Sequence, residues 1–137
     1  MSNHLQRVCR DLLSFADISA TSLSNQGRTV DAFEQTSLDE HSIVQVREDS
    51  HIRTQVLWFF AEWCGHCVKM KAAWEKAHQS ASHLADWHVV DAANSGKQLT
   101  NLMGVRSFPA VKRIRTNIVE DFDGNRTPEG LIAFATA

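Results

Sequence analysis

The chain has 137 residues, 43% of them hydrophobic and 22% charged, which is ordinary for a single globular domain. Its formal net charge is only −2, so neither nucleic acid nor an anionic membrane surface is indicated as a partner. No apolar run approaches the roughly 18 residues of a membrane-spanning helix. Three cysteines are too few for a disulfide-stabilised scaffold.

The amino end does not have the pattern of a secretory signal, because Arg10 and Asp11 interrupt its apolar residues. The chain closes on "FATA", which is not an endoplasmic-reticulum retention signal. We therefore expect a cytoplasmic or virion-associated protein, unless a leader has been trimmed from this sequence.

The first expected element is an amphipathic helix over residues 4–16, whose apolar positions follow the i, i+3, i+4, i+7 spacing. Cys9 lies on its apolar face and is expected to be a buried small side chain, with a regulatory thiol as the alternative. The polar residues 19–28 predict a linker. Residues 1–28 are thus an added helix and linker, and residues 29–137 form the main domain.

The rest of the chain predicts an alternation of strands and helices. A strand over 29–34 is followed by a helix from Ser37 to about 48, because Ser37 and Glu40 have capping-box spacing. The later elements are a strand over 54–61, a helix over 64–84, a strand over 86–92, a helix over 95–103, two strands over 109–115 and 118–123 joined at Thr116–Asn117, and a last helix opened by Thr127–Pro128. The strand over 54–61 is apolar at consecutive positions, which is typical of a central strand covered on both faces.

Two cysteines, Cys64 and Cys67, follow this strand directly in the stretch "AEWCGHCVKM". Cys64 should lie at the amino end of the next helix, where free N–H groups and the helix dipole stabilise a thiolate. Cys67 comes one helical turn later, which suits a small disulfide ring that resolves a mixed disulfide. There is no second close cysteine pair for a zinc ribbon, so we expect neither a metal nor another cofactor.

At this point the chain resembles the thioredoxin superfamily, and within it the catalytic domains of protein disulfide isomerase. The resemblance covers about residues 29–135 and is carried by "WCGHC", "VDAANSGKQLTNLMGVRSFPAVK" and "FDGNRTPEGLIAF". It implies a thioredoxin fold of the α/β class, with a mixed central sheet flanked by helices. Here the extra amino-terminal helix would be an addition to that fold.

The resemblance assigns roles to five of the residues. Cys64 would be the attacking nucleophile and Cys67 the resolving thiol. Pro109 matches the family's cis-proline, and Phe108 before it would offer backbone groups to an extended substrate. Arg126 matches an arginine that approaches the resolving cysteine and lowers its pKa, with a merely solvated arginine as the alternative.

Three further residues lie next to the cysteines in the sequence. Cationic His66 would stabilise the Cys64 thiolate and make the disulfide more oxidising. Trp63 and Gly65 would belong to the surface that meets the substrate, although Trp63 could instead only shield the thiol.

The sequence departs from the family at a pair of buried charges. The family usually carries an acid six residues before the first active cysteine and a lysine on the next strand; here these positions are Trp58 and Val89. Losing both charges together is physically coherent, because removing one alone would leave a buried charge unpaired. Glu62 is expected to point to solvent and not to replace the acid. We therefore predict slow resolution by Cys67.

These observations favour a protein thiol–disulfide oxidoreductase or isomerase that acts on protein thiols and disulfides. Glutathione or a reductase is a candidate electron partner, and neither nucleic acid nor a membrane is expected. One alternative is a thioredoxin-like reductant of protein disulfides, because the cytosol keeps thiols reduced. The other is a binding or assembly module with a thioredoxin fold, in which redox activity is dispensable.

Overall fold

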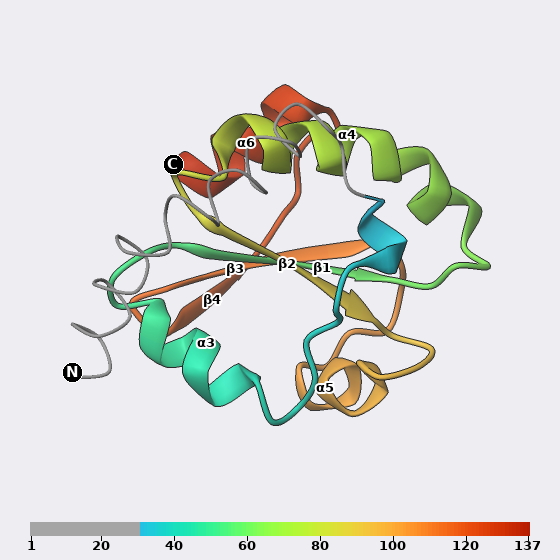
Figure 1. The fold of residues 1–137 in the computed structure, drawn as a ribbon, viewed down its shortest axis with the longest axis horizontal. Coiled ribbons are helices and arrows are strands. Elements are labelled where there is room, and N and C mark those ends of the chain that lie inside the picture. The colour runs from blue at the N-terminus through green and yellow to red at the C-terminus, as the bar shows by residue number, and fades with distance from the viewer. Residues whose placement is uncertain (1–30) are drawn as a thin grey trace, which may run out of the picture.

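The computed structural model describes residues 31–137, and Figure 1 shows the arrangement of their helices and strands. The predicted helix over 4–16, the linker over 19–28 and Cys9 lie outside the described residues. Within the described part, no helix is both long enough and apolar enough to cross a membrane.

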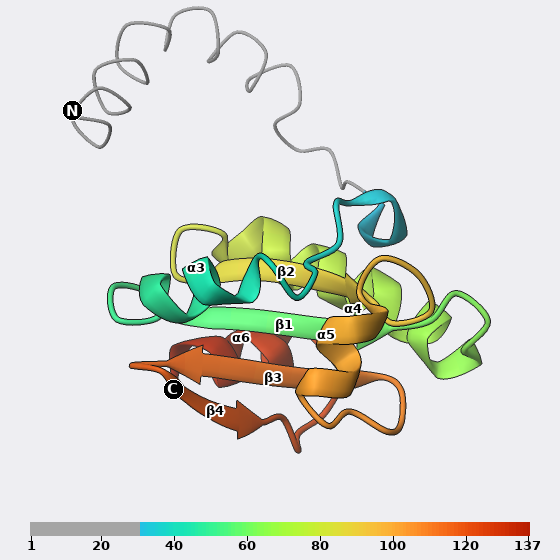
Figure 2. The same cartoon turned by 90° about the horizontal axis from the view of Figure 1, so that it is seen from below.

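Four strands form one mixed sheet in the order β2-β1-β3-β4, which Figure 2 shows face-on with the strands in this order from top to bottom. Its central strand β1 runs parallel to β2 and antiparallel to β3, and β3 runs antiparallel to β4. The strands are β1 (Gln55–Phe60), β2 (Asp86–Asp91), β3 (Ala110–Arg115) and β4 (Ile118–Asp121).

Helices cover both faces of this sheet. Figure 1 shows α4 (Gly65–Ala81) and α6 (Pro128–Thr136) on one face, and α3 (Ile43–Asp49) and α5 (Lys97–Leu102) on the other. The predicted fold class, a mixed central sheet flanked by helices, is confirmed.

Strand β1 is buried along its whole length, as its continuous apolar sequence predicts. Trp58 and Phe60 belong to the apolar cluster that packs under α4 and α6, whereas Leu57 and Phe59 belong to the cluster under α3 and α5. This alternation places the end of β1, and therefore the cysteines that follow it, between two packed layers.

The strand predicted over 29–34 is wrong for the residues that the structure describes. A 3₁₀ helix, η1 (Ala32–Glu34), is present there, and the Asp31 carboxylate caps it by accepting the Phe33 N–H at 2.9 Å. The Phe33 ring stacks on Phe60, with 4.4 Å between ring centroids. Aromatic packing and a local cap thus outweigh the strand propensity of this short stretch.

The helix predicted to begin at Ser37 begins at Ile43 instead. The Ser37 hydroxyl accepts the Asp91 N–H at 2.8 Å, and Ser37 forms an isolated parallel bridge with Val89 at the edge of β2. The side chain that binds the turn before the helix is Asp39, which accepts the N–H groups of His41 and Ser42. The capping-box spacing was therefore misleading.

The remaining boundaries agree with the prediction to within a few residues. Thr116 and Asn117 have φ values of 50° and 63°, as a two-residue hairpin connection requires. Thr127 caps α6 by accepting the Gly130 N–H at 3.0 Å, and Pro128 is its first residue.

Candidate active site

Cys64 is the N-cap residue of α4, in the turn that joins the buried strand β1 to this helix. Its backbone is extended, with φ −86° and ψ 112°, and its sulfur accepts the Cys67 N–H at 3.2 Å. A sulfur in this position receives a helix N–H and faces the positive end of the helix dipole, both of which favour a thiolate. Cys64 keeps 8% of its surface exposed.

Cys67 lies one turn along α4 and is completely buried. Both cysteines are free thiols in this structure. Burial, followed by the hydrogen bond with Cys64, raises the pKa of the Cys67 thiol to about 12, and the positive charge of Arg126 acts in the opposite direction. The two thiols are therefore unlike, since Cys64 keeps a small exposed area and Cys67 is completely buried and held in its neutral form.

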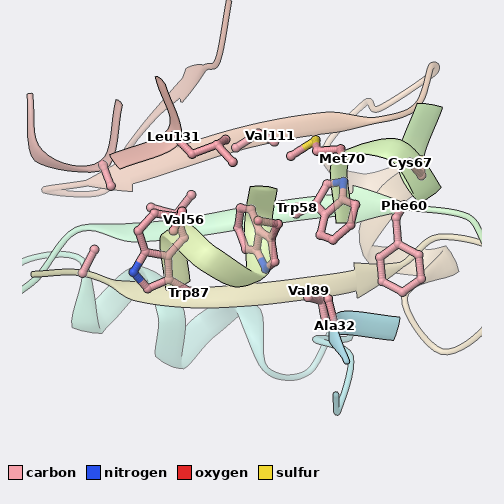
Figure 3. Close-up of a cluster of buried hydrophobic side chains, with 14 of the residues drawn as sticks. Ala32, Val56, Trp58, Phe60, Cys67, Met70, Trp87, Val89, Val111 and Leu131 are labelled. Atoms are coloured by element: carbon pink, nitrogen blue, oxygen red, sulfur yellow. The ribbon is translucent and has the colours of Figure 1, made fainter. Parts of the chain in front are cut away.

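The space beside Cys67 is filled by apolar side chains. Figure 3 shows the packed cluster, which includes Trp58 and Met70 as well as Cys67. Trp58 is fully buried and contacts Phe60 and Trp74, with ring centroids 5.4 and 5.3 Å apart. Sequence reasoning missed Phe33, which adds a fourth ring to this group at 5.7 Å from Trp58, because the prediction assigned it to a strand.

Trp58 and Val89 are partners in the parallel register of β1 and β2, both fully buried or nearly so. The two positions where the family carries an acid and a lysine are thus neighbours in this chain as well, and both are apolar. Glu62 is exposed, as expected from the sequence.

The surface around Cys64 carries two aromatic rings and a cis peptide bond. Trp63 is 74% exposed, and its ring meets Phe108 edge-on at 6.1 Å between centroids. The Phe108–Pro109 peptide bond is cis. Gly65 and His66 are exposed on the first turn of α4, and a Cβ at Gly65 would meet no atom within 4 Å. The structure thus leaves room for a substrate beside Cys64, while the roles of these residues remain predictions.

A hollow of about 450 Å³ lies beside this surface, along the β3–β4 side of the sheet. Pro109 and Arg126 line it, but neither cysteine does. The remaining lining residues are Gly104, Val105, Arg106, Ser107, Ala110, Val111, Lys112, Asp121, Phe122, Asp123 and Gly124. We therefore regard it as a place for the flanking part of a substrate and not as the reaction centre.

Arg126 is exposed, and its positive charge is the smallest of the named influences that act on the pKa of Cys67, in the lowering direction. We predict that Arg126→Gln raises the pKa of Cys67 further, because this charge favours the thiolate. The ultraviolet absorbance of the thiolate, followed against pH in a Cys9→Ser, Cys64→Ser background where Cys67 is the one remaining thiol, measures the change. Arg106→Gln is the matched control, since Arg106 is an exposed arginine that is not among the groups acting on Cys67. Equal titration curves for the two variants would contradict the role of Arg126.

In residues 31–137, no group of three or more histidine, cysteine, aspartate or glutamate side chains is arranged to hold a metal ion.

Comparison with known proteins supports the resemblance. The family model described as Thioredoxin matches residues 27–137. The chain is 38% identical to protein disulfide-isomerase A6 of Mus musculus over 88 residues, which are 59% of this chain and 19% of that protein. A protein disulfide-isomerase of Datisca glomerata is 34% identical over 87 residues, which are 58% of this chain and 17% of the relative. The chain therefore spans only about a fifth of the length of these relatives.

Solved structures share the same fold. The first thioredoxin domain of mouse protein disulfide-isomerase A4 superposes with a TM-score of 0.60 and 28% identity, covering 72% of this chain and 71% of that one. The J-Trx1 fragment of ERdj5 gives a TM-score of 0.65 at 21% identity, covering 77% of this chain and 51% of that fragment. The predicted thioredoxin fold is confirmed.

Proposed function

Because the chain belongs to the thioredoxin family, we propose that it is a protein thiol–disulfide oxidoreductase of the isomerase type. The observation that carries this proposal is the position of Cys64 at the amino end of α4, with its sulfur accepting the Cys67 N–H. The relatives named protein disulfide-isomerase support it.

The reaction begins with the Cys64 thiolate, because a thiolate is the attacking species in disulfide exchange. It attacks one sulfur of a protein disulfide, a mixed disulfide forms on Cys64, and the other substrate sulfur leaves as a thiolate. Cys67 cannot be the attacking thiol, since it is fully buried. The difference in exposure therefore makes Cys64 the first cysteine to react and Cys67 the second.

The substrate would lie over the surface formed by Trp63, Phe108 and Pro109. Exposed aromatic rings provide apolar contact area for an extended chain, and backbone groups next to Pro109 can bind its peptide groups. His66, exposed on the first turn of α4, would adjust the stability of the Cys64 thiolate when it carries a proton.

The reduction potential of the Cys64–Cys67 pair tests this proposal. We expect a value near the isomerase potential of about −180 mV in glutathione buffers, with a mass tag on free thiols as the readout. His66→Ala should shift the potential towards more negative values, and His83→Ala, an exposed histidine beyond the end of α4, should not. A value near the thioredoxin potential of about −270 mV would favour the reductant instead. No exchange with glutathione would favour a binding module.

A further inference from the structure

In the described part of the chain, the side chains that pack around Cys67 are apolar, and its thiol shares a hydrogen bond with Cys64, whose sulfur is no longer a thiolate once it carries the substrate. Trp58 and Trp74 contribute buried indole N–H groups without a hydrogen-bond partner, and an indole nitrogen donates a hydrogen bond but does not accept one. Within residues 31–137, the buried polar or charged side chains are Ser50, Gln55, Thr100 and Arg113, and each of them is hydrogen-bonded to a group other than Cys67.

The carboxylates at the margin of this cluster already have partners. Asp31 forms an ion pair with Lys71 at 2.6 Å, and the hydrogen bond from Lys71 holds the pKa of Asp31 below its usual value. Glu75 accepts the Ala32 N–H at 2.6 Å. Both side chains join η1 to α4. They therefore help to hold η1 against this side of the core.

We infer that the mixed disulfide on Cys64 is released mainly by a second thiol of the substrate and not by Cys67. This inference rests on the proposed function and adds the reaction class: rearrangement of disulfides, in preference to their net oxidation or reduction. Its cause is the apolar pair Trp58 and Val89 beneath a fully buried resolving thiol.

The two routes differ in their products. In release by the substrate, a substrate thiolate attacks the substrate sulfur of the mixed disulfide, a new substrate disulfide forms, and Cys64 leaves as a thiolate, so no electrons are transferred overall. In release by Cys67, this thiol first loses its proton and then attacks the Cys64 sulfur. The substrate then leaves with both of its sulfurs reduced by two electrons, and a Cys64–Cys67 disulfide remains.

The test uses the reduced wild-type chain and two peptides that differ at one position. One peptide has a single disulfide and no other cysteine, and the other has a third cysteine in place of a serine. After mixing, samples are quenched in acid, alkylated and weighed by mass spectrometry. We expect the three-cysteine peptide to appear with a rearranged disulfide at least tenfold faster than the two-cysteine peptide appears fully reduced with a Cys64–Cys67 disulfide left on the chain. Reversal by the peptide's own released thiol only restores the starting disulfide and is not counted.

If the Cys64–Cys67 disulfide formed as fast as the rearranged peptide appeared, the inference would be overturned while the proposed function stayed intact. If neither peptide formed a mixed disulfide on Cys64, the proposed function itself would fail, and the inference with it. Added glutathione gives a second readout: the two-cysteine peptide should leave as its disulfide with glutathione, at a rate that rises in proportion to the thiol concentration. Release of the fully reduced peptide, independent of added thiol and with a Cys64–Cys67 disulfide as the product, would contradict the inference.

Discussion

Raising the pH from 9 to 11 is expected to lower the unfolding free energy of the reduced protein more steeply than that of a Cys67→Ala variant, by about 1.4 kcal/mol per pH unit. The cause is the burial of Cys67, which raises the pKa of this thiol from 9.0 to about 12. Between these two values the unfolded chain has released the Cys67 proton and the folded chain has kept it. The unfolded state therefore binds fewer protons, and stability falls as the pH rises through this window.

Urea unfolding under reducing conditions at several pH values between 8 and 11, followed by tryptophan fluorescence, measures this difference. The chain has four tryptophans and no tyrosine, so no phenol titrates in the same window. Lysine titration affects both proteins equally and cancels in the comparison. Parallel stability curves for wild type and variant would mean that Cys67 ionises in the folded state as readily as in the unfolded one, and would weaken the argument for slow resolution.

The parts of the fold that the sequence predicts well are those where local pattern and tertiary packing agree. The apolar run of β1 predicted a central strand because only a doubly covered strand buries side chains at every position. Thr127 and Pro128 predicted the start of α6 because capping chemistry is local. Neither inference needed contacts that are distant in the sequence.

The errors lie where distant contacts decide the conformation. Asp31 and Phe33 were assigned to a strand, but the first binds Lys71 and the second stacks on Phe60, 27 residues further on by their numbers. Ser37 looked like a helix cap, but its hydroxyl accepts an N–H from Asp91. The sequence shows that such side chains can form these bonds, but it does not show which distant partner competes for them.

In the candidate site, too, some features follow from a local sequence pattern and others depend on contacts between distant residues. The spacing of Cys64 and Cys67 after a buried strand is a local pattern, and their arrangement follows it. The pairing of Trp58 with Val89 could also be found by counting along the two strands, because a parallel register fixes which positions meet. The group of rings around Trp58, which belongs to the same cluster as Cys67, includes Phe33, whose place only the folded structure shows.

Trp58→Glu is expected to speed the release of substrate by Cys67 by a factor of about 100, although it destabilises the fold by about 3–5 kcal/mol. A carboxylate at this position is buried, so its pKa should rise towards neutrality, where it serves best as a general base for the neighbouring thiol. The added Val89→Lys change lies in register with it and should recover part of the lost stability by pairing the charge.

The measurement is the rate at which the Cys64–Cys67 disulfide forms after mixing with the two-cysteine peptide, once circular dichroism has shown that each variant is folded. Trp58→Gln is the matched control, because glutamine has a similar size and polarity but cannot take up a proton. Only the glutamate variant should produce the Cys64–Cys67 disulfide quickly. If the glutamine variant were accelerated equally, loosening of the core would be the cause. If neither folded variant were accelerated, the apolar surroundings of Cys67 could not be what limits its release of substrate.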